Sequence, residues 1–186
     1  MEVLNAMKEQ EQLIEQLYEQ AKRGDWDEVL EAWRTAGLVR ECGKHQKESS
    51  GWTFLHQAAY WGHELACREL IRAGAPAGAL SRERQTPADV AMDRQHATLA
   101  LLLRRASQSG ESVWKAPKDA ALLPSSSLWE DAQQRQALEL RRVAYAGGVV
   151  TIPAGARYYV DSFERTLVGW HGTYDPPCGM DGESMV

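Results

Sequence analysis

The stretch GWTFLHQAAYWGH at residues 51–63 decides how the rest of the chain is interpreted. It predicts one helix over residues 53–60 and, after Gly62, a second helix over residues 63–72 that ends at Gly74, because glycine readily takes the left-handed conformation that closes a helix. The two helices form a helical hairpin. Its apolar stripe, expected to pack against a neighbouring hairpin, comprises Leu55, Ala58, Ala59, Leu70 and Ile71.

The same pattern returns 33 residues further along the chain. Residues 53–59 align with residues 86–92 at this offset, and a fixed period of this length is typical of stacked repeats. Another helical hairpin precedes both, over residues 10–37. Gly24 separates its two helices, and Asp25 is expected to cap the second together with Glu28.

Residues 51–75 resemble an ankyrin repeat almost position for position. The proline that this family usually carries after the threonine is Phe54 here, but it returns as Pro87 in the following copy. That copy departs from the pattern, since Arg84 stands in place of the turn glycine and Gln95 in place of the glycine between the helices.

The resemblance extends to residues 10–37, as a first, capping repeat, and so covers residues 10–106. It implies a stack of about three helical hairpins with a concave binding face and no catalytic residues of its own. Residues 1–106 are therefore expected to form an ankyrin-like repeat domain.

The remainder of the chain resembles no family and is interpreted from its residues alone. Residues 107–127 are rich in serine and proline, which predicts a linker or surface arm with Trp114 as its anchor. A serine cap at Ser127 predicts a helix over residues 128–146. Three β-branched and aromatic runs then predict a small antiparallel β-meander, at residues 149–152, 157–160 and 166–170.

The expected fold class is mainly α: a short ankyrin-like helical-hairpin stack followed by a helix and a small antiparallel β-meander. The helix and the meander form one module over residues 128–175, and residues 176–186 form a flexible tail. Residues 38–50, between the first two hairpins, are expected to form a long loop.

Composition limits the classes of partner. The 186 residues carry a net charge of −5, with a pI near 5.6, which argues against a nucleic-acid binder because phosphates require a basic surface. The same charge disfavours an anionic membrane surface and suits a protein partner with a basic surface. No apolar run is long enough to cross a bilayer. Cys42, Cys67 and Cys178 are odd in number and far apart, as is typical of reduced thiols in a cytoplasmic protein.

On the resemblance, the residues that vary with the binding partner are those of the turns and of the end of the first helix in each hairpin. In the clear repeat these are Ser49, Ser50, Trp52, Tyr60 and Trp61. In the next repeat they are Arg82, Glu83, Gln85, Asp93 and Arg94. Lys22 and Arg23 occupy the equivalent helix end in the first hairpin.

Three of these residues are large aromatics that do not belong to the apolar stripe. Trp52, Tyr60 and Trp61 on one exposed concave patch would form a hot-spot cluster for a partner. The alternative is that residues 38–50 or the C-terminal module fold over the three rings and make them part of the core.

No catalytic residue, metal or cofactor is expected. His56 is interpreted as a structural hydrogen-bonding residue of the repeat turn and His63 as a helix cap. Cys42 and His45 supply two potential ligands where a zinc site requires four.

One constellation resembles an acid–base site, and it comprises Asp161, Glu164, His171 and Asp175. Acidic residues are common in hairpin turns, and no nucleophile or phosphate-binding motif accompanies these four. Their structural interpretation is therefore favoured.

The sequence thus predicts a cytoplasmic, non-enzymatic protein–protein interaction module that binds another protein through a concave ankyrin face. It would act as an inhibitor or immunity-type protein, or as an adaptor. The alternative is an enzyme or small-ligand binder whose site lies at the junction of the ankyrin stack and the C-terminal β module.

Overall fold

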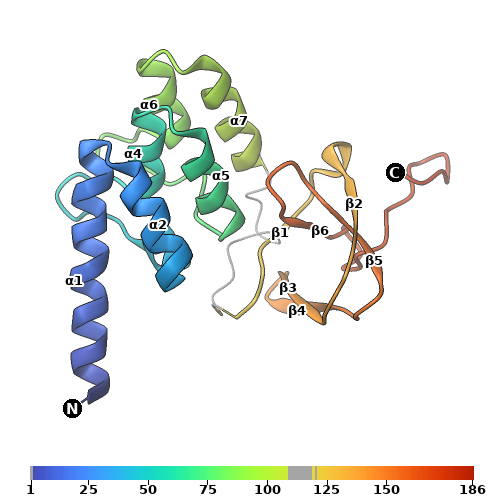
Figure 1. The fold of residues 1–186 in the computed structure, drawn as a ribbon. Coiled ribbons are helices and arrows are strands. Elements are labelled where there is room, and N and C mark those ends of the chain that lie inside the picture. Colours follow the sequence, from blue (N-terminus) through green and yellow to red (C-terminus); the bar gives the residue numbers. More distant parts are fainter. Residues whose placement is uncertain (1, 109–118, 120) are drawn as a thin grey trace. The chain divides into compact units, whose positions relative to one another are not determined.

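The computed structural model describes residues 2–108, 119 and 121–186 (Figure 1). Trp114 and most of the predicted linker at 107–127 lie outside these residues. The chain forms two compact units: the first comprises Met1–Ile71 and Ala75–Arg104, and the second comprises Arg72–Gly74 and Arg105–Val186.

Seven α-helices lie within the described residues before position 109 (Figure 1). They are α1 (Glu2–Arg23), α2 (Trp26–Ala36), α3 (Val39–Lys44), α4 (Phe54–Tyr60), α5 (Glu64–Arg72), α6 (Pro87–Asp93) and α7 (Ala97–Gln108). Short turns join α1 to α2, α4 to α5 and α6 to α7, which gives three helical hairpins. Helix α4 contacts both α1 and α6, so the first helices of the three hairpins lie side by side.

Helices α4 and α6 begin with the same cap. The Thr53 hydroxyl accepts a hydrogen bond from the His56 N–H at 3.3 Å, and the Thr53 N–H donates to His56 Nδ1 at 3.1 Å. Thr86 and Asp89 make the equivalent pair of bonds, at 3.2 and 2.9 Å. Each cap satisfies two backbone N–H groups that a helix start would otherwise leave without a partner. The 33-residue period of the sequence therefore recurs as a repeated cap.

The turns around these helices use residues with positive φ. Gly51 and Gly62 have φ values of 70° and 67°, and the residues 33 positions later, Arg84 and Gln95, have φ values of 61° and 66°. A residue with a side chain pays roughly 1–2 kcal/mol for this conformation. The turn geometry is thus present even where the sequence carries no glycine.

The predicted long loop at 38–50 is wrong in its first half. Residues Val39–Lys44 form helix α3, which buries Cys42 and Gly43. A Cβ at position 43 would lie 3.2 Å from the Cβ of Ala75, so this short helix packs closely against the segment after α5.

The predicted capping box at the start of α2 is also wrong. Asp25 makes no side-chain cap hydrogen bond; its carboxylate accepts one from Arg23 Nε at 3.1 Å, and Glu28 accepts one from Gln20 at 2.7 Å. The glycine that was expected to end α2 is confirmed, because Gly37 has a φ of 65° and donates its N–H to Trp33.

The interior of the first unit is aliphatic and aromatic. The predicted stripe of the clear hairpin is confirmed as buried, with Leu55, Ala58, Ala59, Leu70 and Ile71 each at most 1% exposed. The Phe54 ring packs between rings of the first hairpin, with centroids 5.3 Å from Tyr18 and 6.1 Å from Trp33.

The second unit is built from short strands. They are β1 (Ser125–Ser126), β2 (Gln133–Gln136), β3 (Arg141–Tyr145), β4 (Gly148–Ile152), β5 (Arg157–Val160) and β6 (Thr166–Leu167), with the 3₁₀ turn η2 (Trp129–Asp131) after β1. One mixed sheet has the strand order β1-β6-β5-β2, in which β1 runs parallel to β6 and the other neighbours run antiparallel. Strands β3 and β4 form a separate antiparallel hairpin.

The predicted fold class, mainly α, is wrong, because the chain is mixed α and β. Residues 121–186 contain no α-helix. The helix predicted over 128–146 is replaced by η2, β2 and β3. Strand β2 pairs with β5, with Gln133 opposite Val160 and Gln136 opposite Arg157, and such long-range pairing overrides the helix preference of the residues.

The predicted three-stranded meander is wrong as well. Its three runs overlap strands β4, β5 and β6, but β4 pairs with β3, and β5 lies between β2 and β6. Thr166–Leu167 is also shorter than the predicted run at 166–170.

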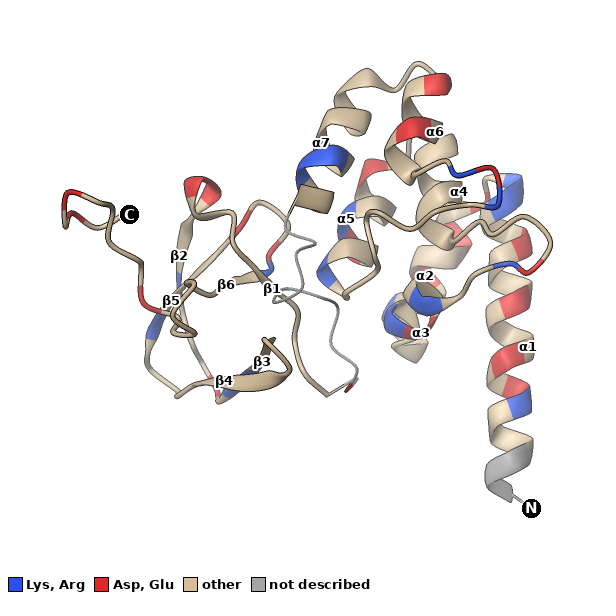
Figure 2. Cartoon of the chain, turned by 180° about the vertical axis from the view of Figure 1, so that it is seen from behind, with Lys and Arg blue, Asp and Glu red and all other residues tan. Residues whose placement is uncertain are grey.

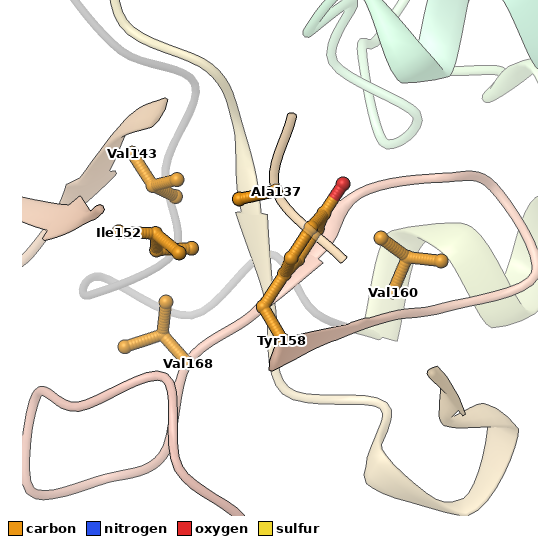
Figure 3. Close-up of a cluster of buried hydrophobic side chains, with 6 residues drawn as sticks. All are labelled: Ala137, Val143, Ile152, Tyr158, Val160 and Val168. Atoms are coloured by element: carbon orange, nitrogen blue, oxygen red, sulfur yellow. The ribbon is translucent and has the colours of Figure 1, made fainter. Parts of the chain in front are cut away.

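The core of the second unit draws on both sheets. Figure 3 shows its buried side chains, which are Ala137, Val143, Ile152, Tyr158, Val160 and Val168. The neighbouring ring of Tyr159 packs in a different cluster, with Trp129 and Leu167, because successive side chains of a strand point to opposite faces. Within the described residues, no helix combines the length and the apolar character needed to cross a membrane.

Candidate functional site

A hollow of about 420 Å³ opens in the first unit beside α1 and α4. Three segments supply its lining: α1, the segment that leads into α4, and α4 with the turn after it. The lining residues are Tyr18, Lys22, Lys47, Ser49, Ser50, Trp52, Gln57, Tyr60 and Trp61. We call this site the aromatic hollow. Its volume lies in the range of ligand-binding pockets, about 300–1,000 Å³.

Three aromatic rings form a connected wall of the hollow. The Trp52 and Tyr60 centroids are 6.0 Å apart, and the Tyr60 and Trp61 rings meet edge to face at 5.5 Å. Trp52 also stacks on the His56 ring at 5.7 Å. Trp61 is 45% exposed, whereas Trp52 and Tyr60 are half-buried. The wall therefore exposes ring surface to solvent, while packing holds Trp52 and Tyr60 in place.

A tight loop fixes the approach to α4. The Lys47 N–H donates to the Trp52 carbonyl at 2.8 Å, and the Gly51 N–H donates to the Lys47 carbonyl at 2.7 Å. The Arg82 N–H donates to the Ser50 carbonyl at 2.9 Å. A Cβ at position 51 would lie 2.7 Å from Arg82 N, which is why this close approach requires glycine.

Trp61 is held across the turn between α1 and α2. Its indole Nε1–H donates to the Lys22 carbonyl at 3.3 Å. Its ring covers Gly24, where a Cβ would lie only 3.0 Å from the ring. The orientation of this exposed ring is therefore set by the first hairpin as well as by α4.

The floor of the hollow is polar and hydrogen-bonded. Gln57 Nε2 donates to the Tyr18 hydroxyl oxygen at 2.9 Å. Burial raises the pKa of the Tyr18 phenol, and the Gln57 hydrogen bond partly opposes that shift. The phenol thus remains protonated at neutral pH and keeps its O–H as a donor.

The charged residues in the lining are two lysines. Lys47 is ion-paired with Glu15 and lies 3.5 Å from Glu19, with its ammonium 5.7 Å from the Tyr18 ring centroid. Lys22 makes one ion pair, 3.7 Å from Glu19. Among the residues that the structure describes, no carboxylate lines the aromatic hollow itself.

The binding residues predicted for the clear repeat come together. Ser49, Ser50, Trp52, Tyr60 and Trp61 all line the aromatic hollow. The segment at 38–50, one of the two alternative covers for the rings, supplies part of the wall and leaves the hollow open.

The residues predicted in the next repeat are placed differently. The Arg94 guanidinium stacks 4.3 Å from the Tyr60 centroid, and Arg82 lines an adjacent hollow with Lys47 and Ser49. Gln85 donates from its side chain to Asp93 at 2.9 Å. Glu83 is exposed and does not line the aromatic hollow.

Sequence reasoning missed Tyr18, Lys47 and Gln57. Tyr18 belongs to the apolar stripe of α1 and therefore resembles a core residue. The hydrogen bond between Gln57 and Tyr18 joins residues 39 positions apart, and Lys47 lies in the segment predicted as irregular. No local pattern in the sequence marks these three residues as neighbours.

The two histidines of the clear repeat have the structural partners expected of them. His56 is fully buried, accepts at Nδ1 from the Thr53 N–H, and lies with Nε2 3.0 Å from the Gln85 carbonyl, so Nε2 carries the proton. His63 Nδ1 accepts from the Ala66 N–H at 3.2 Å, which confirms its role as a helix cap.

Three of the four residues of the acid–base constellation in the second unit are engaged in separate contacts. Asp161 is fully buried and accepts from Arg165 Nε at 2.8 Å. Glu164 pairs with Arg135 at 2.7 Å, and His171 contacts Thr173 at 3.3 Å. Within the described part of the chain, no three His, Cys, Asp or Glu side chains are grouped so that they could hold a metal ion.

Comparisons with known proteins give a partial likeness. No family model matches the chain. The chain is 38% identical over 72 residues to oxysterol-binding protein-related protein 1 of Rattus norvegicus, a match that covers 36% of this chain and 8% of that protein. The chain thus spans less than a tenth of the relative's length, and the likeness concerns that stretch alone.

Proposed function

We propose that this chain is a non-enzymatic protein-binding module of the ankyrin-repeat type, which binds its partner through the aromatic hollow. The proposal is supported by the equivalent caps at Thr53 and Thr86. It is also supported by the positive φ angles at positions 51, 62, 84 and 95. Both features follow the 33-residue period that the ankyrin resemblance requires.

One observation carries the binding role. Trp52, Tyr60 and Trp61 form a single wall of an open hollow. Tryptophan and tyrosine side chains dominate the binding energy of protein interfaces, because they bury a large area with few rotatable bonds. An open wall of such rings favours a protein partner.

The setting that we propose is the cytoplasm, where the protein would act as an inhibitor or immunity-type protein, or as an adaptor. All three cysteines are unpaired: Cys42 and Cys67 are buried, and Cys178 is exposed. Thiols of this kind are usual in a reducing compartment. The net charge of −5 would steer the chain toward a partner whose overall surface is basic.

Partner capture tests this function. The full chain serves as bait in a lysate of its native cell, next to the Trp52→Ala/Trp61→Ala double variant and a Trp170→Ala control. Trp170 is a good control because it is 75% exposed and belongs to the second unit. We expect a protein that the wild type and the control capture equally and that the double variant recovers at least about tenfold less, which corresponds to about 1.4 kcal/mol.

The double variant must first be shown to be folded, by its far-ultraviolet circular dichroism and its urea midpoint. If a folded double variant captures the same protein in the same amount, the aromatic hollow is not the binding site.

A further inference from the structure

The charged residues that line the aromatic hollow are basic, although the chain as a whole is acidic. The chain carries −5, and in Figure 2 much of the ribbon of α1 has the red of Asp and Glu residues. The basic residues of α1's last turn are Lys22 and Arg23, and Lys22 lines the hollow together with Lys47. A ligand inside the hollow therefore meets cations before it meets carboxylates.

Two cations are available to a ligand: Lys22, which lines the hollow, and Arg94, which is outside the lining but contacts the lining residue Tyr60. Lys22 has a 60% exposed side chain and a single long contact with Glu19, and an exposed pair of this kind contributes little. Arg94 stacks on Tyr60 and forms no ion pair with any described carboxylate. A stacked guanidinium still presents its N–H groups at its edge, where a carboxylate can bind in a bidentate manner.

Lys47 is less available. Its ammonium pairs with Glu15 and Glu19 and lies against the Tyr18 ring. Because these carboxylates offset its charge, Lys47 contributes less than Lys22 to the binding of an anionic ligand.

From these charges and rings we propose that the aromatic hollow binds an acidic peptide segment of the partner. An apolar or aromatic side chain of that segment packs on Trp52, Tyr60 and Trp61, and a flanking Asp or Glu pairs with Lys22 and Arg94. This inference rests on the proposed function and names the chemistry of the partner.

Other occupants fit the site less well. A lysine or arginine side chain would gain cation–π contacts with the rings but would be repelled by Lys22, Lys47 and Arg94. A nucleic acid needs an extended row of cations, and Glu15 and Glu19 stand beside Lys47. A short acidic peptide satisfies the local cations and the rings together.

Selection from a library of random twelve-residue peptides displayed on phage, with the full chain immobilised, tests this inference. The variants are Trp61→Ala, Lys22→Glu and Lys8→Glu. Lys8→Glu is the matched control, because it makes the same charge change on an exposed residue of the same helix, about 21 Å away at 1.5 Å per residue. We expect enrichment of peptides that carry an aromatic residue or leucine beside Asp or Glu.

Enriched peptides are then synthesised, and their affinities are measured by calorimetry. Lys22→Glu, and replacement of the peptide's Asp and Glu by Asn and Gln, should each weaken binding about tenfold, or about 1.4 kcal/mol. Trp61→Ala should abolish binding, and Lys8→Glu should change it less than about twofold, since exposed charges that far apart are screened. Raising the salt concentration should weaken the acidic peptides selectively.

The outcomes separate the two proposals. If the enriched peptides are basic or uncharged and depend on Trp61 but not on Lys22, the acidic-peptide inference is overturned and the binding function stands. Failure to enrich any Trp61-dependent peptide also overturns the inference, while partner capture by the wild type tests the function separately. Binding of a 20-nucleotide single-stranded DNA that depends on Lys22 in place of peptide binding would overturn it as well.

Discussion

At the scale of single residues, the repeat geometry depends more on backbone conformation than on residue identity. Arg84 and Gln95 have positive φ values, although neither is a glycine. The equivalent glycines, 51 and 62, face close contacts as well: a Cβ at position 62 would lie 2.6 Å from the His96 ring. The two copies therefore differ in how much strain their turns contain.

Arg84→Gly and Gln95→Gly should each stabilise the protein. Glycine removes the cost of the left-handed conformation, roughly 1–2 kcal/mol, and loses part of that gain to the larger entropy of its unfolded state. The expected net increase in the free energy of unfolding is about 0.5–1 kcal/mol each, measured by urea titration. Arg82→Gly is the control, because Arg82 has no positive φ; it should destabilise the protein, and a gain there equal to that of Arg84→Gly would contradict the explanation.

Stability should fall as the pH drops below about 6.5. Burial lowers the pKa of His56, so the unfolded chain takes up a proton at a higher pH than the folded chain does. The contribution of neutral His56 to the free energy of unfolding is therefore complete above the unfolded-state pKa of about 6.5. It is lost as the pH falls toward the folded-state pKa, by at most about 1.4 kcal/mol per pH unit for one group. His45 has its pKa lowered by burial too and adds to the same slope.

Urea titrations at pH 7.5 and 5.5 measure this effect. The drop in free energy should be smaller for His56→Gln than for the wild type or for the control His171→Gln, whose exposed side chain lies outside the caps. Equal drops in all three proteins would show that His56 is not the titrating group.

At the scale of elements, sequence reasoning succeeded where the signal is local. The helices at 54–60 and 64–72 follow from one apolar stripe, a threonine cap and the glycines at 62 and 74. It failed at 128–146, because the stretch QQRQ has no strand signal of its own and becomes β2 only through pairing with Arg157–Val160. The same distinction applies to the aromatic hollow. Trp52, Tyr60 and Trp61 could be predicted because they lie outside the apolar stripe, whereas Tyr18 and Gln57 are distant in sequence and come into contact only in the folded chain.

The turn between β5 and β6 depends on a buried ion pair. Asp161 accepts hydrogen bonds from the N–H groups of Phe163 and Arg165, and its other oxygen pairs with Arg165 Nε at 2.8 Å. Arg165 Nη1 donates to the Ala106 carbonyl at 3.2 Å. Both side chains are at most 8% exposed.

Asp161→Ala should therefore be strongly destabilising. It leaves the Arg165 charge buried without its partner, at a cost of about 3–5 kcal/mol in the free energy of unfolding. Glu164→Gln is the control in the same turn, because the Glu164–Arg135 pair is partly exposed and such pairs contribute about 0–1 kcal/mol. Guanidinium titration distinguishes the two, and similar losses for both variants would contradict the role of burial.

At the scale of the whole molecule, the three cysteines should differ in reactivity. Cys42 and Cys67 are buried and Cys178 is exposed. Burial raises the pKa of Cys42 to about 11 and raises that of Cys67 further, and the thiolate is the reactive form. Ellman's reagent at pH 7.5 should label one thiol rapidly in the native protein and all three in guanidinium, and Cys178→Ser should remove the rapid phase. Rapid labelling of Cys42 or Cys67 would contradict their burial.

Site-specific photo-crosslinking shows directly whether the aromatic hollow binds a partner protein. The photoreactive residue p-benzoylphenylalanine replaces Trp61 in one full chain and Trp170 in another, and each is irradiated in the native cell. We expect a discrete adduct with one partner from position 61 and none from position 170. Adducts from position 170 together with none from position 61 would contradict this expectation.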